Sequence, residues 1–464
     1  MSDWKQIWQQ KYDIVPAQLE KIKHKHTVVT AFNTNIDAVV KISGTQLSEL
    51  AQKMHVSADM AQTGKCQIDT PKDVLRGIIK CFISGNAEEW IVSSTEIYDW
   101  IKQNIGYDCL QMGGQGGIVA NAMAVLGVKK VVAHTASHPL LQAKQFLDLP
   151  NLFAIDENGK LRPARQINRL SDAPLIHWII EFAKDDSLSL DDQTYTCPKA
   201  NRFIASYDPS NIDLDINNAF IQYADKNGYD YLVLSGFHGL KSEQNGVERI
   251  KTAAEIIKKW KSLHQQGIIH LELASTQDKN IRRAIIENIA PLADSLGLND
   301  REALDALEII NPAQYEVLRQ QELHAPQLFA ICRQIMQKTQ TSRLQMHMFG
   351  LYLTLQNKEF SISCNQNLHG MMLAATVAAS KAGLGKLEKS ADLLWAHQNV
   401  PTNLLTDELQ NLAEFLQKPE ILTDGIAELD DFNLIAVPTL IIAKPRTLVG
   451  MGDTISSVSL VAAR

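Results

Sequence analysis

Short apolar runs alternate with longer amphipathic stretches over the second half of the chain. The runs 231–236, 268–274 and 294–299 have the composition and length of buried strands. Apolar positions within 242–265 and 281–289 recur with helical spacing. A regular alternation of strand and helix predicts a mostly parallel sheet flanked by helices, and therefore an α/β fold.

The first half of the chain shows the same pattern more sparsely. Residues 27–32 and 128–133 are apolar and β-branched, as expected of buried strands. Residues 3–23 predict an amphipathic helix that is interrupted near Pro16. The remaining predicted elements are a helix at 71–82, strands at 175–182 and 201–204, helices within 385–420 and paired strands within 434–442.

Two stretches lack the strand–helix rhythm, and they predict a second, smaller domain. We assign residues 38–109 and 156–205 to a discontinuous α+β lid domain. The large α/β domain then takes residues 1–37, 110–155 and 206–464. A chain of 464 residues that is 45% hydrophobic can build one large core and a second lobe.

Composition and charge narrow the range of functions. The formal net charge is −7 and the pI is near 6.0, so nothing favours nucleic acid or an anionic membrane as a partner. The 6 cysteines are scattered without metal-ligand spacing, and no segment is long and apolar enough to span a bilayer. We expect a cytoplasmic protein with reduced thiols and small-molecule substrates, monomeric or assembled as a small homo-oligomer.

A glycine turn near the C-terminus is the strongest chemical signal. Gly450-Met451-Gly452-Asp453 is followed by an apolar segment of small residues, which predicts a tight turn that opens a helix. Backbone N–H groups at such a turn bind phosphate, and the helix N-terminus adds partial positive charge. Asp453 would accept a proton from a hydroxyl that attacks phosphorus. The alternative is that Asp453 is only a helix-capping residue.

A second glycine-rich segment, Gly113-Gly114-Gln115-Gly116-Gly117, leads into an apolar helix. Its spacing does not match a dinucleotide fingerprint, and the sequence predicts no suitable strand immediately before it. Close approach of the backbone to a small ligand and tight packing of the helix both explain these glycines.

Polar residues follow the first predicted strand. Asn33, Asn35 and Asp37 stand where an open α/β sheet binds its ligand, and they could hydrogen-bond sugar hydroxyls or simply form a polar turn. His177 lies in an apolar strand, where a core role is the usual alternative. Arg202 lies in another apolar strand and needs an anion, either a buried carboxylate or a phosphate.

Acidic residues at two strand ends predict a cation site. Glu272 lies in a buried strand with His270 on the same face, and Glu302 follows the next strand with Asn299 three positions before it. Oxygen ligands from two strand ends suit Mg²⁺ bound to substrate phosphates. Asn299 and Glu302 could instead form only a capping box.

Taken together, these motifs resemble the ADP-dependent sugar kinases, the glucokinases and phosphofructokinases of the ribokinase-like superfamily. The matching stretches run in family order over almost the whole chain: 32–37, 113–114, His177 with Glu181, 200–204, 270–275, 295–302 and 450–456.

The resemblance implies a role for each motif, with ADP as phosphoryl donor and AMP as product. Asp453 would be the catalytic base, and Gly450, Met451 and Gly452 the anion hole for the transferred phosphoryl group. Glu272, Glu302 and Asp453 would organise Mg²⁺, partly through water. The implied sugar-binding residues are Asn33, Asn35, Asp37, Glu89, Gly113, Gly114 and His177. The implied nucleotide-binding residues are Arg202, which would reach from the lid to the ADP phosphates, and Asn299, His369, Gly370, Val437 and Val449.

The acceptor stays open between two sugars, or a pocket that takes both. Glu88 or Glu89 would bind glucose hydroxyls, which favours glucose slightly. Fructose 6-phosphate needs a basic cluster, for which the candidates are Lys160, Arg162, Arg165, Arg169 and Lys199. Two rival functions are an ATP-dependent kinase of the wider superfamily and a catalytically idle sugar- or nucleotide-binding protein.

Overall fold

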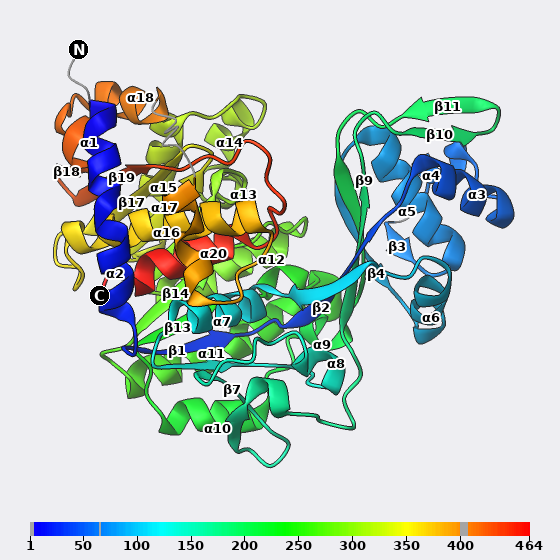
Figure 1. The fold of residues 1–464 in the computed structure, drawn as a ribbon, viewed down its shortest axis with the longest axis horizontal. Helices are drawn as coiled ribbons and strands as arrows, with labels where there is room; N and C mark the ends of the chain where they lie inside the picture. Colours follow the sequence, from blue (N-terminus) through cyan, green and yellow to red (C-terminus); the bar gives the residue numbers. More distant parts are fainter. Residues whose placement is uncertain (1–3, 65, 400–406) are drawn as a thin grey trace.

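The computed structural model describes residues 4–64, 66–399 and 407–464, so part of the helical region predicted within 385–420 lies outside the described residues. Figure 1 shows a large lobe and a small lobe that are joined by the strands β2, β5, β9 and β12. An eleven-stranded sheet forms the centre of the large lobe, and a six-stranded sheet forms the small lobe. The α/β class predicted from the sequence is therefore confirmed.

The centre of the large sheet is parallel, as predicted. Its parallel strands, in spatial order, are β16 (Arg343–Met348), β15 (Ser295–Asn299), β14 (Ile268–Glu272), β13 (Tyr231–Leu234), β1 (Thr27–Ala31), β6 (Lys130–Ala133) and β7 (Leu152–Ile155). Four strands at the margins are antiparallel to their neighbours: β17 (Leu351–Asn357), β19 (Phe432–Pro438), β18 (Ile426–Glu428) and β8 (Leu161–Pro163). The region 434–442 thus contributes to one strand, β19, and the prediction of paired strands there is wrong.

Two layers of helices cover this sheet. The first contains α7 (Gln115–Leu126), α16 (Cys364–Leu384) and α20 (Met451–Val461). In it, α20 packs on both α7 and α16, and α16 also packs on α2 (Val15–Ile22). The second runs from α10 (Asn218–Lys226) through α11 (Gly246–Leu263), α12 (Lys279–Ala284) and α13 (Asp300–Ile310) to α15 (Ala325–Thr339). Other helices of this lobe are α1 (Trp4–Lys11), α14 (Pro312–Leu318), α17 (Trp395–Asn399), α18 (Asp407–Leu416) and α19 (Glu420–Asp424).

The predicted break near Pro16 is confirmed. A 3₁₀ turn, Tyr12–Ile14, separates α1 from α2, and Pro16 lies in the first turn of α2, where its missing N–H costs no helical hydrogen bond. The helix α16 was not predicted from the sequence. It ends where Gly385 adopts a left-handed conformation with φ +90°, so the segment directly after it is not helical.

The small lobe begins and ends at other residues than predicted. Its sheet has the order β3 (Gln67–Ile68), β4 (Glu88–Val92), β12 (Asn201–Tyr207), β9 (Ile176–Phe182), β2 (Asn35–Lys41) and β5 (Cys109–Gly113). Its helices are α3 (Gly44–Met54), α4 (Ala58–Gln62), α5 (Pro71–Ser84) and α6 (Thr95–Asn104), and the hairpin β10 (Ser187–Leu190) with β11 (Gln193–Thr196) extends it. Residues 161–163 instead belong to the large sheet, because β8 pairs with β7, so the predicted lid boundary at 156 is too early. Asn35 and Asp37, assigned to the large domain, lie in β2 of the small sheet.

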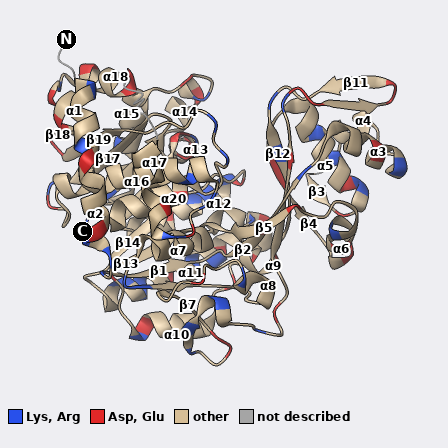
Figure 2. Cartoon of the chain, viewed as in Figure 1, with Lys and Arg blue, Asp and Glu red and all other residues tan. Residues whose placement is uncertain are grey.

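The carboxyl ends of the parallel strands form one edge of the large sheet, next to the small lobe. One row across this edge is given by the strand register: Asn299 pairs with His347, His347 with Tyr352, and Tyr352 with Val437. Ligands of open α/β sheets bind at this edge. Figure 2 shows Lys and Arg interspersed with Asp and Glu over both lobes, consistent with the absence of a basic excess.

Candidate active site

The C-terminal glycine turn has the predicted form. Gly450 adopts φ +61° at the N-cap position, and α20 begins at Met451. Asp453 is the third residue of the helix and is buried, with 8% exposure. Because Gly450 is the N-cap, Asp453 does not serve as the capping residue, and its carboxylate is available for chemistry.

Two side chains from distant segments hold this turn in place. The Gln115 amide donates from Nε2 to Asp453 Oδ1 at 2.8 Å, and its Oε1 accepts from the Gly236 N–H at 3.3 Å. The Lys381 ammonium donates to the Gly450 carbonyl at 2.9 Å and to Thr454 Oγ1 at 3.1 Å. Burial raises the pKa of Asp453, although Gln115 and Lys381 oppose the increase. A raised pKa suits a group that must take up a proton.

Glu272 and Glu302 meet Asp453 beneath the turn. Glu272 is 4% exposed, and burial together with the charges of Asp453 and Glu302 raises its pKa well above the usual value. Burial also raises the pKa of Glu302 to about 8. Gly297 makes room for Glu272, because a methyl group on Gly297 would lie 1.9 Å from Glu272 Oε2. The three acids are therefore close enough for their charges to act on one another.

The capping-box interpretation of Asn299 and Glu302 is confirmed, because both of its hydrogen bonds are present. Asn299 Oδ1 accepts from the Glu302 N–H at 2.9 Å, and Glu302 Oε2 accepts from the Asn299 N–H at 2.8 Å. The box fixes Glu302 at the start of α13 with its second carboxylate oxygen uncommitted. Capping and cation binding are compatible roles for this residue.

The second half of the site is a cavity of ≈ 560 Å³ between the lobes. His177 from β9 lines this cavity: its Nε2 is 2.9 Å from Asp208 Oδ2, and its Nδ1 is 3.8 Å from Glu89 Oε1. Burial lowers the pKa of His177, but the hydrogen bond to Asp208 and the charges of Glu89 and Asp37 outweigh it and raise the pKa to about 9. His177 is therefore a cation at neutral pH, and not a core residue. Other lining residues are Asn33, Ser206, Asn211, His238 and Lys241.

Both adjacent glutamates of β4 line this cavity, but their contacts differ. Glu88 pairs with Lys80 at 2.8 Å and accepts from the Trp90 indole N–H at 2.8 Å, so its charge is committed within the small lobe. Glu89 is 44% exposed and accepts a hydrogen bond from the Ser206 hydroxyl. Enclosure raises the pKa of Glu89, but the charge of His177 and the Ser206 hydroxyl outweigh this effect, and the pKa lies below its usual value. Glu89 is thus the more exposed of the two carboxylates, and its ionised form is favoured.

Gly113 and Gly114 pack closely against polar residues of β2. A methyl group on Gly113 would lie 2.2 Å from Asp37 Oδ1, and one on Gly114 would lie 2.7 Å from Asn35 Oδ1. Asn35 Nδ2 donates to Asp37 Oδ1 at 3.1 Å, and burial raises the pKa of Asp37 to about 6. The prediction that no strand precedes this segment is wrong, because β5 ends at Gly113. That strand is antiparallel to β2 in the small sheet, so the segment is still not a dinucleotide fingerprint.

Several buried polar atoms at the site have no hydrogen-bond partner in the described part of the chain: Asn35 Oδ1, His238 Nδ1 and His347 Nδ1. Buried polar groups in native proteins are almost always paired. Three orphaned atoms around one site therefore indicate a polar ligand.

Two nucleotide-binding predictions are placed elsewhere by the structure. Gly370 packs against the far end of α20, where a methyl group would lie 2.3 Å from the Ser459 carbonyl oxygen. His369 lies close enough to Lys11 and Lys21 for their charges to lower its pKa, after burial. Lys381, at the other end of α16, contacts the glycine turn, so His369 and Gly370 are about three helical turns away from it. The edge histidine is His347, whose Nε2 would lie 2.7 Å from a methyl group on Gly452.

The other predicted residues at the edge are in place. Asn299 and Val437 share the strand row with His347, and the half-buried Val449 immediately precedes Gly450. Arg202 lies in β12 of the small lobe, half-buried, and its charge acts on Asp37. It forms no ion pair among the described residues, so the carboxylate partner that the sequence allowed is absent there.

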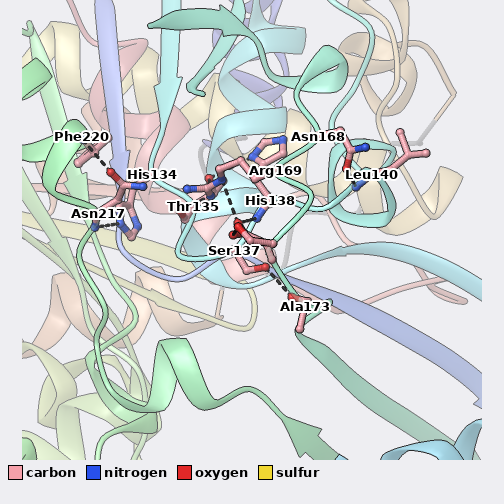
Figure 3. Close-up of polar contacts among 12 residues, drawn as sticks. His134, Thr135, Ser137, His138, Leu140, Asn168, Arg169, Ala173, Asn217 and Phe220 are labelled. Carbon is pink, nitrogen blue, oxygen red and sulfur yellow. Dashed lines mark hydrogen bonds and ion pairs between the residues drawn. The ribbon is translucent and has the colours of Figure 1, made fainter. Parts of the chain in front are cut away.

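The predicted basic cluster does not form. Figure 3 shows Arg169 among the buried side chains near His134 and His138, where its Nη2 donates to the Thr135 carbonyl and hydroxyl at 2.8 Å. Arg162 pairs with Asp156 at 3.5 Å, and Arg165 donates to the Lys144 and Phe146 carbonyls. None of Lys160, Arg162, Arg165, Arg169 and Lys199 lines the cavity between the lobes. The three arginines instead form contacts within the large lobe, and Lys199 lies just before β12.

Sequence reasoning missed five residues of the site: Gln115, Asp208, His238, His347 and Lys381. Asp208 had a usable signal, because Asp-Pro directly after a strand is typical of a helix N-cap, and Asp208 accepts from the Asn211 N–H. The other four are recognisable only through their contacts with distant segments.

A buried carboxylate at a glycine turn, acids at adjacent strand ends and a polar cavity beneath a second lobe define a small-molecule kinase. Residues 26–462 match the conserved region described as ADP-specific Phosphofructokinase/Glucokinase, and the chain belongs to this family of ADP-dependent sugar kinases.

Relatives of both kinds match along nearly the whole chain. The chain is 28% identical to an ADP-specific phosphofructokinase of Methanosarcina acetivorans, over 96% of this chain and 94% of that protein. It is 31% identical to an ADP-dependent glucose/glucosamine kinase of Pyrococcus abyssi, over 99% and 98%. A solved ADP-dependent kinase in complex with fructose-6-phosphate and ADPbetaS is 27% identical, with a TM-score of 0.79 and coverage of 100% of this chain and 98% of that one. In the described residues, no helix is long and apolar enough to cross a membrane.

Proposed function

We propose that this kinase transfers the β-phosphoryl group of ADP to fructose 6-phosphate, with glucose as the second candidate acceptor. The observation that carries the proposal is the position of Asp453, buried at the glycine turn and held by Gln115. Its carboxylate takes the proton from the acceptor hydroxyl as the new oxygen–phosphorus bond forms. The anhydride oxygen–phosphorus bond breaks, AMP leaves with the bonding electron pair, and the N–H groups of the glycine turn stabilise the transferred group.

A divalent cation fits the acidic half of this site. Three mutually repelling carboxylates, Glu272, Glu302 and Asp453, lie close together, and burial disfavours their ionised forms. In the described residues, no three side chains of His, Cys, Asp or Glu converge closely enough to ligate one ion directly. Glu272 and Glu302 would therefore hold Mg²⁺ partly through water. When bound, Mg²⁺ neutralises charge on the ADP phosphates.

Two cations support a phosphorylated acceptor. Lys241 lines the cavity, is half-buried and has no ion pair among the described residues, and its charge acts on Glu89 and His238. Arg202 on the small lobe likewise forms no ion pair within the part of the chain that the structure describes. A phosphate of the acceptor would pair with Lys241, whereas Arg202 can serve either substrate. The relatives named phosphofructokinase and the complex with fructose-6-phosphate favour the same acceptor.

Glu89 supports glucose as the second candidate. Its ionised carboxylate in the cavity binds hydroxyls well and repels a phosphate. The Pyrococcus relative named glucose/glucosamine kinase favours glucose as well.

The test is AMP production from ADP and Mg²⁺ with each sugar in parallel, for the wild type, Lys241→Gln and Lys258→Gln. Lys258 is an exposed lysine of α11 and serves as the matched control. Loss of one charge-assisted hydrogen bond, about 1.5–3 kcal/mol, should raise the KM for fructose 6-phosphate roughly 10- to 100-fold in Lys241→Gln only. Turnover with glucose alone would reverse the choice of acceptor, and turnover with ATP but not ADP would overturn the donor.

A further inference from the structure

Arg343 is a fully buried arginine, with 0% exposure, in the strand β16. Its guanidinium forms no ion pair with a carboxylate among the described residues. Its partners are neutral: Asn367 Oδ1 at 3.0 Å, Ser295 Oγ at 3.0 Å, Gln345 Oε1 at 2.7 Å and Ser459 Oγ at 3.1 Å. Burying a cation without an anion is costly, so this arginine needs an explanation beyond packing.

A directed chain of hydrogen bonds links Arg343 to the acidic site. Ser295 Oγ is 3.0 Å from His270 Nδ1, and His270 Nε2 is 3.3 Å from Glu272 Oε2. His270 is fully buried, and each ring nitrogen has one partner: Ser295 Oγ at Nδ1 and Glu272 Oε2 at Nε2. Because Arg343 donates to Ser295 Oγ, the serine proton is free to bond to His270 Nδ1, which leaves Nε2–H to donate to Glu272. Every donor in the chain then points toward the carboxylate.

We propose that Arg343 is a positioning residue for Glu272, acting through Ser295 and His270. The chain fixes the tautomer of His270 and the orientation of the Glu272 carboxylate. This inference rests on the cation-binding role proposed for Glu272. Partners behind a metal ligand commonly contribute 10- to 100-fold to metal affinity.

Two alanine variants separate this role from packing. Ser295→Ala and Ser459→Ala each remove one buried hydroxyl that accepts from Arg343, but only Ser295 contacts His270. ¹⁵N NMR of the metal-free enzyme reports the His270 tautomer. We expect a single Nε2–H tautomer in the wild type and Ser459→Ala and a mixture in Ser295→Ala. The Mg²⁺ concentration for half-maximal activity should rise about tenfold in Ser295→Ala only.

An unchanged tautomer in Ser295→Ala, or equal effects of the two variants, would overturn the proposal. The variant Glu272→Gln tests the underlying role separately. If it leaves the Mg²⁺ requirement unchanged while Ser295→Ala still alters the tautomer, the metal role fails and the hydrogen-bond chain stands.

A different observation concerns a cavity of ≈ 360 Å³ behind the glycine turn, which shares no lining residue with the cavity between the lobes. Lys144, Arg165 and Lys381 line it, and none of these three pairs with a carboxylate among the described residues. The fourth cation, Lys386, pairs with Glu388 at 2.8 Å. Apolar lining comes from Ile118, Phe146, Leu147 and Leu387. A cationic wall beside an apolar one favours a small anion with an organic part.

Lys381 connects this cavity to catalysis, because the same ammonium that lines it donates to the Gly450 carbonyl at 2.9 Å. Arg165 is held by the Lys144 and Phe146 carbonyls, at 2.9 and 2.7 Å, which orients its guanidinium. We propose that the cavity binds a small phosphate ester, which would contact Lys381 and alter the glycine turn. An oriented arginine with a neighbouring lysine suits a phosphate.

The probe is glycerol 3-phosphate, added at saturating ADP, Mg²⁺ and acceptor. We expect a change in kcat that persists at saturating substrates, and binding detected by calorimetry to the enzyme saturated with AMP and acceptor. Lys144→Gln should keep the basal activity and lose both effects, whereas Lys258→Gln should keep them. Purely competitive inhibition, absence of binding, or an undiminished effect in Lys144→Gln would overturn the proposal.

Discussion

Two acidic clusters meet in the active site, and they balance their charges in opposite ways. In the small-lobe cluster, Asp37, Glu89 and Asp208 surround His177, whose pKa is raised to about 9. In the large-lobe cluster, Asp453, Glu272 and Glu302 act on one another without a histidinium among them.

The pKa shifts record this difference. Burial raises the pKa of each large-lobe carboxyl group, to about 8 for Glu302. His270, the histidine nearest to Glu272, is kept neutral by its own burial. In the small lobe, His177 counteracts burial, and the pKa of Glu89 lies below its usual value. In the large lobe, the charges of Lys381 and Arg343 oppose the effect of burial but do not outweigh it, so a ligand that brings a cation would further stabilise these carboxylates.

The largest expected effect is on the base. Asp453→Asn keeps an oxygen to accept from Gln115 but cannot take up a proton, so we expect kcat to fall by about 10²–10⁴. Steady-state AMP production measures kcat, and calorimetry with ADP should show near-normal affinity. A thermal melt controls for folding. Near-normal turnover would contradict the role of Asp453.

Replacing an acid in the large-lobe cluster should lower activity and raise stability. Glu272→Gln removes a buried charge that lacks a cation, so the metal-free protein should gain about 1 kcal/mol or more in its free energy of unfolding. Because the pKa of Glu272 is raised in the folded state, the wild type loses stability as pH rises above the usual glutamate pKa. The glutamine variant has no such loss, so its advantage in stability should grow with pH. The Mg²⁺ requirement should increase about tenfold.

Urea unfolding without metal, at several pH values, measures the stability of Glu272→Gln. The exposed Glu20→Gln is the control, because it changes the same charge away from the cluster. A less stable Glu272→Gln would show that the protein itself already balances this carboxylate.

The large-lobe cluster is also the part of the site for which the sequence holds the clearest signals. Glu272 in a buried strand and Glu302 just after the next strand stand out because a charge in an apolar run is expensive. Because β14 and β15 are parallel neighbours, their carboxyl ends lie at the same edge of the sheet. The local sequence pattern and this one rule of topology are enough to place both acids there. The glycine turn is similarly local, because its φ of +61° at Gly450 requires a residue such as glycine.

The rest of the site depends on contacts that no local pattern contains. Lys381 and Gln115 reach the turn from α16 and α7, and nothing near them in the sequence indicates a partner. His347 was missed because β16 carries buried Arg343 and Gln345, whose polarity hides the strand. The lid boundary was set too early because β8 is short and exposed, and so resembles a loop.

A smaller effect is expected from removing His177, the cation of the small-lobe cluster. His177→Asn leaves Asp37, Glu89 and Asp208 without their shared positive charge, so the carboxylates should repel one another and lose their orientation toward the acceptor. We expect the KM for the acceptor to rise about tenfold, while the KM for ADP changes less than twofold, as a single charge-assisted contact implies. Steady-state kinetics with each substrate varied in turn measures both values. Equal changes in the two KM values would contradict a separate acceptor half of the site.

The smallest expected effect is the pH dependence of the same residue. The folded pKa of His177, about 9, lies above its usual value of 6.5, so its protonated form stabilises the fold. This contribution is fully present below pH 6.5 and is lost as pH rises through about 9. The acceptor KM should therefore stay constant to about pH 8 and then rise a few-fold. Lys381, with a pKa lowered by burial to about 8, titrates nearby, but it contacts the glycine turn and should affect kcat instead. Asp208→Asn removes the hydrogen-bonded carboxylate of His177 and should move the rise in KM to lower pH, whereas an unmoved profile would assign the titration to another group.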